Sequence, residues 1–343
     1  MNKIGIKTFH HKQAIHCESG VTANLLTHHG IPLSEPMAFG LGKGLSFGYY
    51  PPNIYFNKFH LLKKQPLITY RTRSGRILKN AAKCSGASVI RKKYYKPHSF
   101  LHALDILLSR EEPVAVLAGL SWLPYIPKNK RFNYNEHHLV VYGLENNNYQ
   151  ISDPMMENTT TCSSEDLIRA VFNNDTRNNT ATLSYLRFQD HNKSVLKEAR
   201  EAIRTTARWL TKNPFPLCGI NGIHLLSNRL TKWDTKYSLE QTTNNLKQII
   251  IMQERIGTGG GGFRFLYSAF LQECAMMLGD EALHQSSQEL IKAGERWQDF
   301  AESAASICSH GPKGSRCYNI MSDIIRECGE REENVFKTLL ATC

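Results

Sequence analysis

The spacing of apolar residues changes near Asp190, and this change limits the folds that the sequence can adopt. Before it, short apolar runs typical of strands are mixed with a few helical stretches, whereas from Lys193 onward apolar residues recur at helical spacing. The 343 residues are also too many for one ordinary core, since about 150 residues per domain is usual. We therefore expect an α+β domain over residues 1–190 and an all-helical domain over residues 191–343.

The apolar pattern also predicts individual elements. A helix is expected over residues 16–29, ended by Gly30, and the Gly-, Pro- and aromatic-rich stretch that follows is expected to form loops or irregular strands over 31–57. Further predictions in the first domain are strands over 67–71, 113–120, 138–142, 149–152 and 183–188, a helix over 98–109 and a surface loop over 173–180. In the second domain, helices are predicted over 195–211, 223–229, 239–256, 262–278, 281–305 and 322–342.

The composition restricts the class of protein. Hydrophobic residues make up 41% of the chain and charged residues 21%, which is typical of a globular protein. No apolar run reaches the ~18 residues needed to span a bilayer, and the first 20 residues lack the apolar core of a secretion signal. The nine cysteines are odd in number and form no C-x-x-C pair, which argues against a disulfide framework and a structural zinc site. We expect a cytoplasmic protein with reduced thiols.

The positive charge is concentrated in one part of the sequence. The net charge is +12, and residues 36–104 contain no Asp or Glu while Lys and Arg recur. Such a segment attracts an acidic partner, namely a nucleic acid, an anionic membrane or an acidic protein, unless it is only a solvated basic face. Tyrosines interleave with the basic residues, as in proteins that stack on single strands, but no nucleic-acid-binding motif accompanies them. We therefore favour an acidic protein over a nucleic acid.

Cys17 opens the first predicted helix, in the segment HCESGVTANLLTHHG. The N-terminus of a helix has unsatisfied N–H groups and a positive dipole end, and both favour a thiolate nucleophile. The Cys17 N–H can stabilise a developing oxyanion, with the Gln13 side-chain amide as the candidate second donor. The alternative is a small buried core cysteine without chemistry.

A cysteine nucleophile needs a base and a group that orients the base. His138 begins the strand in HLVVYG, and Asp153 lies at the end of the next strand, in YQISDP. If LENNN joins these strands as a hairpin, the start of one strand lies beside the end of the other, which would make His138 and Asp153 neighbours. His137 is the alternative to His138. Adjacent strand residues face opposite sides of a sheet, so only one of the two histidines can face Cys17. The alternatives are a solvent-facing histidine and an Asp-Pro turn.

Two other features have weaker functional interpretations. Glu18, early in the first helix, can hold a substrate amine, but a carboxylate there also stabilises the helix dipole, and we favour that structural role. The segment GTGGGGFR at 257–264 lacks the Lys-Ser/Thr of a phosphate-binding P-loop and the strand that should precede it. Its glycines then serve as a flexible joint that permits close helix packing.

The first block, HCESGVTANLLTHHGIPLSEPMAFGLGKGLSFGY, resembles the opening of the butirosin biosynthesis protein H family, whose N-terminal domain is papain-like. HHLVVYG and YQISDP resemble that family's histidine strand and Asp-Pro turn, so the implied triad is Cys17, His138 and Asp153. RIGTGGGGFRFLYSAFLQE and AGERW resemble the family's helical C-terminal domain. The related bacteriocin-leader peptidases have their oxyanion Gln six residues before the cysteine, where this chain has His11.

The resemblance implies a reaction. An acyl group would pass from the thioester of an acidic acyl carrier protein to Cys17 and then to a small amine acceptor, without a metal or other cofactor. Candidate docking residues for the carrier are Arg91, Lys92 and Lys93, and Gly260 and Arg264 are expected to line the acceptor or pantetheine path. The alternatives are a cysteine peptidase, amidase or thioester hydrolase of the same fold, and a binding module without catalysis.

Overall fold

The chain forms two compact units in the computed structural model, which describes residues 3–52, 55–56, 59–60, 65–132, 134–172, 180–189, 194–312 and 314–343. The first unit contains Met1–Ala38 and Ser74–Ser194, and the second contains Phe39–Arg73 and Val195–Cys343. The chain thus enters the second unit at Phe39, returns to the first at Ser74 and leaves it again near Val195. A single boundary at residue 190 does not describe this division, and residue 190 itself lies outside the described residues.

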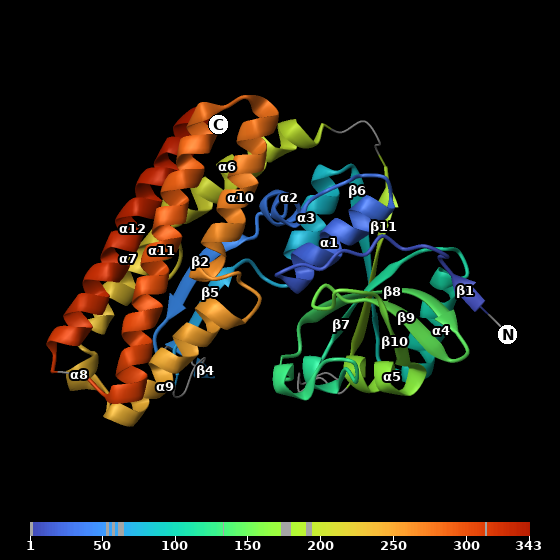
Figure 1. The fold of residues 1–343 in the computed structure, drawn as a ribbon, viewed down its shortest axis with the longest axis horizontal. Coiled ribbons are helices and arrows are strands. Elements are labelled where there is room, and N and C mark those ends of the chain that lie inside the picture. Colours follow the sequence, from blue (N-terminus) through green and yellow to red (C-terminus); the bar gives the residue numbers. More distant parts are fainter. Residues whose placement is uncertain are drawn as a thin grey trace. The chain divides into compact units, whose positions relative to one another are not determined.

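The first unit is built on a seven-stranded sheet in which every neighbouring pair is antiparallel (Figure 1). The strand order is β10-β9-β8-β7-β11-β6, and the short strand β1 pairs with the far half of β8. The strands are β1 (Lys3–Gly5), β6 (Ala87–Tyr94), β7 (Val114–Ala118), β8 (His137–Glu145), β9 (Asn148–Ser152), β10 (Thr160–Ser163) and β11 (Ala181–Phe188).

Helices pack on the sheet of the first unit. Helix α4 (Pro97–Leu108) and helix α5 (Ser164–Phe172) share one buried apolar cluster with alternate residues of the central strands, such as Val116, Leu139 and Val141. Helix α1 (Cys17–His28) contacts β8 and helix α3 (Arg76–Cys84), and α3 contacts β6. Because side chains alternate along a strand, the intervening residues of β7 and β8, Leu117 and His138 among them, face away from the α4–α5 cluster.

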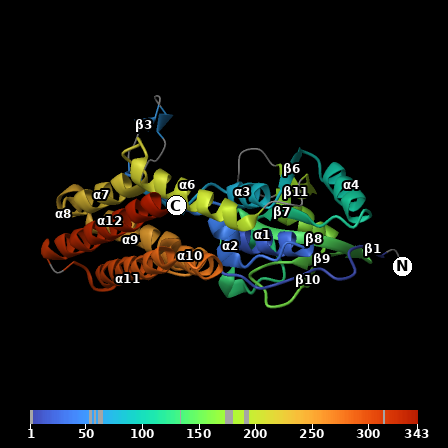
Figure 2. The same ribbon diagram turned by 90° about the horizontal axis from the view of Figure 1, so that it is seen from above.

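The second unit is mainly helical (Figures 1 and 2). Its helices are α6 (Val195–Lys212), α7 (Gly219–Leu230), α8 (Trp233–Lys236), α9 (Leu239–Ile250), α10 (Arg264–Leu278), α11 (Glu281–His310) and α12 (Arg316–Thr342). The strands β2 (Leu45–Tyr50) and β5 (Leu67–Arg71) form an antiparallel pair in which β2 also contacts α6 and α7, and the short strands β3 (Tyr55–Phe56) and β4 (Phe59–His60) form another. These contacts explain why residues 39–73 belong to the helical unit.

The predicted fold class, a mixed α+β part followed by a helical part, is confirmed. The prediction of loops or irregular strands over residues 31–57 is incomplete, because this stretch also contains helix α2 (Glu35–Leu41). The helical unit is also not purely helical, since it includes the strands β2 and β5. The loop predicted over 173–180 lies outside the described residues except for Thr180. All nine cysteines are free thiols. In the described part of the chain, no helix is long and apolar enough to cross a membrane.

Candidate active site

Cys17 is the first residue of α1 and is almost completely buried, with 8% of its surface exposed. His16 caps the helix, and its ring accepts a hydrogen bond from the Ser19 N–H at 3.3 Å. One turn later, Gly20 lies against Pro154, and a Cβ atom at position 20 would come within 2.8 Å of the proline ring. The glycine therefore allows the start of α1 to approach the segment that follows Asp153.

The chain just before Cys17 is fixed by a partly buried carboxylate, that of Glu35 at the start of α2. It accepts hydrogen bonds from the N–H groups of Ile15 at 2.9 Å and His16 at 2.7 Å, and from the Ser19 hydroxyl at 2.9 Å. Burial raises the pKa of Glu35, although these hydrogen bonds partly oppose that effect. The backbone on the N-terminal side of the sulfur is therefore held in one conformation by three donors on a single acceptor.

His137 lies between Cys17 and Asp153. Its Nε2 donates a hydrogen bond to Asp153 Oδ2 at 2.8 Å, and the ring also has a hydrogen-bonding contact with the Cys17 side chain. With Nε2 occupied by the carboxylate, Nδ1 is the nitrogen left to face the sulfur. Burial alone would lower the pKa of His137, but the neighbouring Asp153 and Cys17 outweigh it and raise that pKa to about 10. The arrangement therefore favours the imidazolium form.

Asp153 follows β9 and is completely buried. The Tyr125 hydroxyl donates to its Oδ2 at 2.9 Å, and the Met155 N–H donates to its Oδ1 at 2.9 Å. Burial alone would raise the pKa of Asp153, but the charge of His137 and the hydrogen bonds outweigh it and lower that pKa. The carboxylate thus stays ionised next to the imidazole.

The prediction that His138 is the neighbour of Asp153 is wrong. The predicted β8–β9 hairpin exists, and its register pairs Val140 with Ser152. Asp153, one residue further on, therefore continues the face of β8 that carries Leu139 and His137, not the face of His138. His138 Nε2 is instead hydrogen-bonded to Ser74 Oγ at 3.0 Å and lies 3.7 Å from the Glu18 carboxylate.

Residues 16–154 match the family described as butirosin biosynthesis protein H, N-terminal, and residues 165–339 match a family described as a domain of unknown function, DUF4872. The DUF4872 match covers about half of the chain, so the chain belongs to this DUF4872 family. A crystal structure of a putative C39-like peptidase from Bacillus anthracis is similar at 13% sequence identity, over 55% of this chain and 100% of that chain, with a TM-score of 0.37. No curated protein matches the chain.

The side chain predicted to be the second oxyanion donor, Gln13, is directed elsewhere. The Gln13 amide is exposed and donates to the Met155 carbonyl at 3.4 Å. His11, at the position where the related peptidases have glutamine, is hydrogen-bonded through Nδ1 to Ser152 Oγ at 2.8 Å and through Nε2 to the Met156 carbonyl at 3.1 Å. Both side chains therefore connect the segment before Cys17 to the segment around Asp153.

Glu18 has a structural position, which does not fit the substrate-binding alternative. Its side chain is completely buried, and its Oε1 accepts the N–H groups of Ile77 at 2.8 Å and Leu78 at 3.2 Å. These N–H groups belong to the first turn of α3, where a carboxylate also interacts favourably with the helix dipole. Glu18 therefore joins α1, the helix that begins with Cys17, to α3.

Arg264 cannot serve the predicted substrate path as a phosphate ligand, because it is completely buried and its donors are occupied within the second unit. Its Nε and Nη2 donate to the Glu332 carboxylate at 2.9 and 2.8 Å, and its Nη1 donates to the Gly262 carbonyl at 2.8 Å. The guanidinium also lies over the rings of Trp297, Tyr70 and Phe47, with its carbon 5.0, 5.5 and 5.9 Å from their centroids.

Gly260 belongs to the same structural unit as Arg264. Its φ of +86° is left-handed, and its N–H donates to the Thr258 hydroxyl at 3.1 Å. The next residue, Gly261, donates its N–H to the Glu254 carboxylate at 3.2 Å. The glycine-rich segment is thus a folded turn before α10, and the predicted role of Gly260 on a substrate path has no support from these contacts.

The three basic residues predicted to dock a carrier, Arg91, Lys92 and Lys93, are exposed on β6. β6 is the last strand in the order of the large sheet, so one of its edges is unpaired in the described part of the chain. Charged residues on an edge strand also prevent unwanted pairing with other strands. Their exposure is therefore compatible with docking but does not require it.

Sequence reasoning did not find two residues that support the site. Tyr125, a donor to Asp153, lies between two 3₁₀ turns, and nothing in its sequence neighbourhood marks it. Glu35 lies in a helix start that the sequence could have shown, because Ser34 and Pro36 are residues typical of that position. In the structure, the Ser34 hydroxyl caps α2 by accepting the Met37 N–H at 3.1 Å. Among the residues that the structure describes, no group of three or more His, Cys, Asp and Glu side chains is placed to bind a metal ion.

Proposed function

We propose that this chain is a cysteine-dependent acyltransferase that moves an acyl group from a carrier-protein thioester to an amine acceptor. The nucleophile is Cys17, the proton carrier is His137 and the orienting carboxylate is Asp153. The observation that supports this proposal is the position of the His137 ring, which contacts Cys17 and donates to Asp153. Of the two histidines considered from the sequence, the proposal uses His137 in place of His138.

In the first half of the reaction, Cys17 Sγ attacks the thioester carbonyl carbon, and the thiol proton resides on His137. The tetrahedral intermediate collapses by breaking the bond to the pantetheine sulfur, which takes the proton from the imidazolium. The products are an acyl-Cys17 thioester and a free carrier thiol. Asp153 keeps the ring in the orientation and tautomer that this transfer needs.

In the second half, the nitrogen of the amine attacks the acyl-Cys17 carbonyl while His137 accepts a proton from it. The intermediate then expels Cys17 Sγ, and an amide is released. If water attacks instead, the product is a free acid, and the protein is a hydrolase with the same first half. The name of the family that matches residues 16–154 associates this chain with natural-product biosynthesis, and this association favours a small amine over water.

The test is incubation with an acyl-carrier thioester and a panel of amines, followed by mass spectrometry of the intact protein and of the small products. We expect an acyl adduct on Cys17 and then an amide. Cys17→Ala should abolish both products, whereas Cys84→Ala, which removes another buried thiol of the same unit, should keep them. Free acid alone would favour the hydrolase, and the absence of an adduct on Cys17 would favour a binding module without catalysis.

The carrier would bind through its acidic surface to the exposed lysines of β6. The variant Lys92→Glu/Lys93→Glu should then weaken carrier binding at low salt, and added salt should reduce the difference from the unchanged protein. Lys232→Glu, an exposed charge reversal in the second unit, is the control and should bind the carrier normally. Equal carrier affinity of all three proteins at low salt would remove β6 from the docking proposal.

A further inference from the structure

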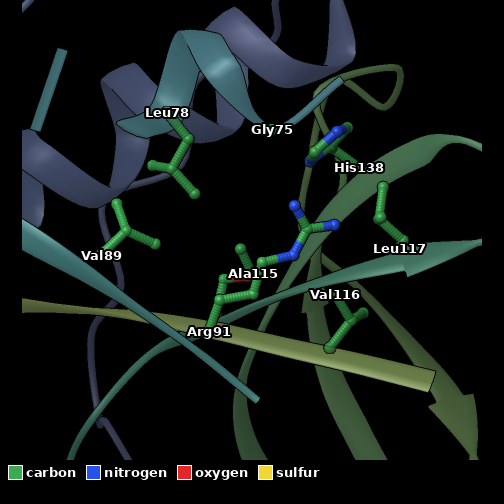
Figure 3. A pocket seen from close by; sticks show the side chains of 9 residues that line it. Gly75, Leu78, Val89, Arg91, Ala115, Val116, Leu117 and His138 are labelled. Atoms are coloured by element: carbon green, nitrogen blue, oxygen red, sulfur yellow. The ribbon is translucent and has the colours of Figure 1, made fainter. Parts of the chain in front are cut away.

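A pocket lies in the first unit beside His138, on the side of the histidine pair that the proposed reaction does not use. It is lined by residues of α3 and of four strands of the large sheet: Gly75, Leu78, Val89, Arg91, Ala115, Val116, Leu117, His138 and Ser184. Figure 3 shows the Arg91 side chain reaching from β6 across the pocket toward His138. All lining residues belong to one compact unit, so this unit alone forms the pocket.

Small residues in one row across the sheet leave the space that forms the pocket. The register places Arg91 opposite Ser184 and Ser184 opposite Ala115, so one long side chain and two short ones follow each other across three strands. Above this row, Gly75 precedes α3, and a Cβ atom there would lie 2.8 Å from Arg91 Nη1. Because Gly75 has no side chain, the Arg91 guanidinium can occupy this space.

The Arg91 guanidinium has donor capacity that the protein does not use. Within the residues that the structure describes, no hydrogen bond or ion pair engages it. Figure 3 shows its nitrogens directed toward the His138 ring. Most other lining residues are apolar, among them Leu78, Val89 and Leu117, whereas the Arg91 side chain is exposed and can therefore be reached by a dissolved anion.

Next to the pocket, the Glu18 carboxylate lies close to His138, and its charge is already neutralised in part. Its Oε1 accepts two N–H groups of α3, and its Oε2 lies 3.7 Å from His138 Nε2. The Ser74 hydroxyl is hydrogen-bonded to the same nitrogen, at 3.0 Å. Arg91 is therefore the positive group of the pocket that remains available for a ligand.

We propose that this pocket binds one small anionic group, a phosphate or a carboxylate, through the Arg91 guanidinium and beside the His138 ring. Two parallel N–H bonds from a guanidinium suit both kinds of anion. The anion can belong to a free metabolite or to the phosphate of a pantetheine arm. The proposal concerns binding alone, so it does not depend on the acyl-transfer reaction or on the reactivity of Cys17.

The experiment is an NMR titration of the full chain with inorganic phosphate and with acetate, followed through the ring signals of His138. We expect saturable shifts and, in Arg91→Ala, binding at least about tenfold weaker, because a charge-assisted contact is lost. Lys79→Ala is the matched control: it removes an exposed charge from α3, next to Leu78, and should change the affinity by less than about twofold.

A second variant tests the position of the guanidinium while Arg91 is kept. Gly75→Ala places a methyl group where Arg91 Nη1 lies, at a residue with a left-handed φ of +82°, and should also weaken binding about tenfold. The melting temperature of this variant is measured as well. If Gly75→Ala does not fold, the comparison of Arg91→Ala with Lys79→Ala decides. Shifts of the His138 ring that survive in Arg91→Ala, or no shifts with either anion, would overturn the proposal.

The source of the anion is decided by a further pair of probes. Phosphopantetheine binding at least about tenfold more tightly than pantetheine, with the difference abolished in Arg91→Ala, would assign the pocket to the carrier arm. Equal binding of these two probes, with phosphate or acetate still bound through Arg91, would assign it to a free metabolite. Both results support an anion site, and they differ only in the source of the ligand.

Discussion

At the scale of single residues, the proposed chemistry depends on which of two adjacent histidines faces the Cys17 sulfur. His137 and His138 are both nearly buried, at 2% and 4% exposure, and both lie near a carboxylate. Only the carboxylate beside His137, that of Asp153, leaves a ring nitrogen for Cys17. The carboxylate beside His138, that of Glu18, is committed to α3.

The two histidines can be separated by substitution. We expect His137→Ala to slow acylation of Cys17 by a thioester by about 10²–10⁴-fold, because the proton carrier is lost. His138→Ala should slow it by less than about tenfold, since this ring acts on α3 and not on the sulfur. The rate is measured by intact-mass spectrometry after rapid quenching. A larger effect of His138→Ala would restore the original prediction that His138 is the base.

The charged state of His137 also predicts how stability depends on pH. Because its folded pKa is raised to about 10, protonated His137 stabilises the fold fully below its ordinary pKa, and this contribution is lost as the pH rises toward 10. In His137→Gln the contribution is absent at all pH values. The free energy of unfolding of the two proteins should therefore differ most between about pH 5 and 7 and converge toward pH 10.

Urea unfolding at a series of pH values measures this difference. At the acid end, Asp153 works in the opposite direction: its pKa is lowered, so its contribution is present above its ordinary pKa and is lost as the pH falls through the lowered one. The gap between the two proteins should narrow there as well. A gap that stays constant from neutral pH to pH 10 would contradict a charged His137.

At the scale of helices and strands, the active-site segment is held by contacts between elements that are distant in the sequence. Residues 11–14, before α1, run beside residues 152–156, after β9: the Ala14 N–H donates to the Pro154 carbonyl at 2.9 Å, and His11 bonds both Ser152 and Met156. Glu18 then joins α1 to α3. These links explain how a nucleophile and a carboxylate 136 residues apart keep a fixed distance through one histidine.

The link between α1 and α3 can be tested by replacing Glu18. Glu18→Ala leaves two buried N–H groups of α3 without an acceptor and should cost about 1–3 kcal/mol of the free energy of unfolding. Glu18→Gln keeps an acceptor oxygen and should cost less. Hydrogen exchange of the Ile77 and Leu78 amides should accelerate in Glu18→Ala. The control Glu157→Ala removes an exposed carboxylate of the same unit and should leave both measurements unchanged.

Elements with a strong apolar period were predictable, and those with polar or mixed sequences were not. The helix at α1, the strand β5 and the β8–β9 hairpin follow from spacing and turn residues. Helix α3 and strand β6 were missed because their sequences, RILKNAAKC and ASVIRKKY, each contain three basic residues and only a short apolar run. Their stability comes from tertiary contacts such as Glu18 on α3 and the full-length pairing of β6 with β11, which a local pattern does not contain.

The same limit explains the outcome for the site. Cys17 and Asp153 could be identified as residues of interest, because a helix start and a strand end are visible in the sequence. The choice between His137 and His138 depends on a register of one residue, since the parity of the Val140–Ser152 pair decides which face Asp153 shares. Arg264 was predicted to bind a ligand because an arginine beside glycines does not show in the sequence that it will be buried. Its partner Glu332 lies 68 residues away, so the ion pair could not be predicted from the local sequence.

At the scale of the whole molecule, each unit has a buried charged group that organises it. In the first unit this group is the His137–Asp153 pair, next to the proposed nucleophile. In the second unit it is the Arg264–Glu332 pair, which also receives a hydrogen bond from the Trp297 indole N–H at 2.6 Å. The second pair joins α10 to α12 and, through Trp297, to α11, so it connects three helices with one ion pair.

A buried ion pair of this kind predicts a specific pattern of stability. Arg264→Met leaves the Glu332 carboxylate uncompensated in the core and should cost about 3–5 kcal/mol of the free energy of unfolding. The double variant Arg264→Met/Glu332→Met removes both charges and should recover most of that loss. The control Lys292→Met breaks an exposed pair with Glu289 on α11 and should cost less than about 1 kcal/mol.

Urea unfolding followed by tryptophan fluorescence measures the stability of the second unit in these variants. Three of the four tryptophans belong to that unit, namely Trp209, Trp233 and Trp297. Trp297 contacts the ion pair directly, so its emission should also shift in Arg264→Met. If Arg264→Met is as stable as the control, the guanidinium does not hold the helices together. A ligand role for Arg264 would then deserve a new test, whereas recovery in the double variant assigns the arginine to the core of its unit.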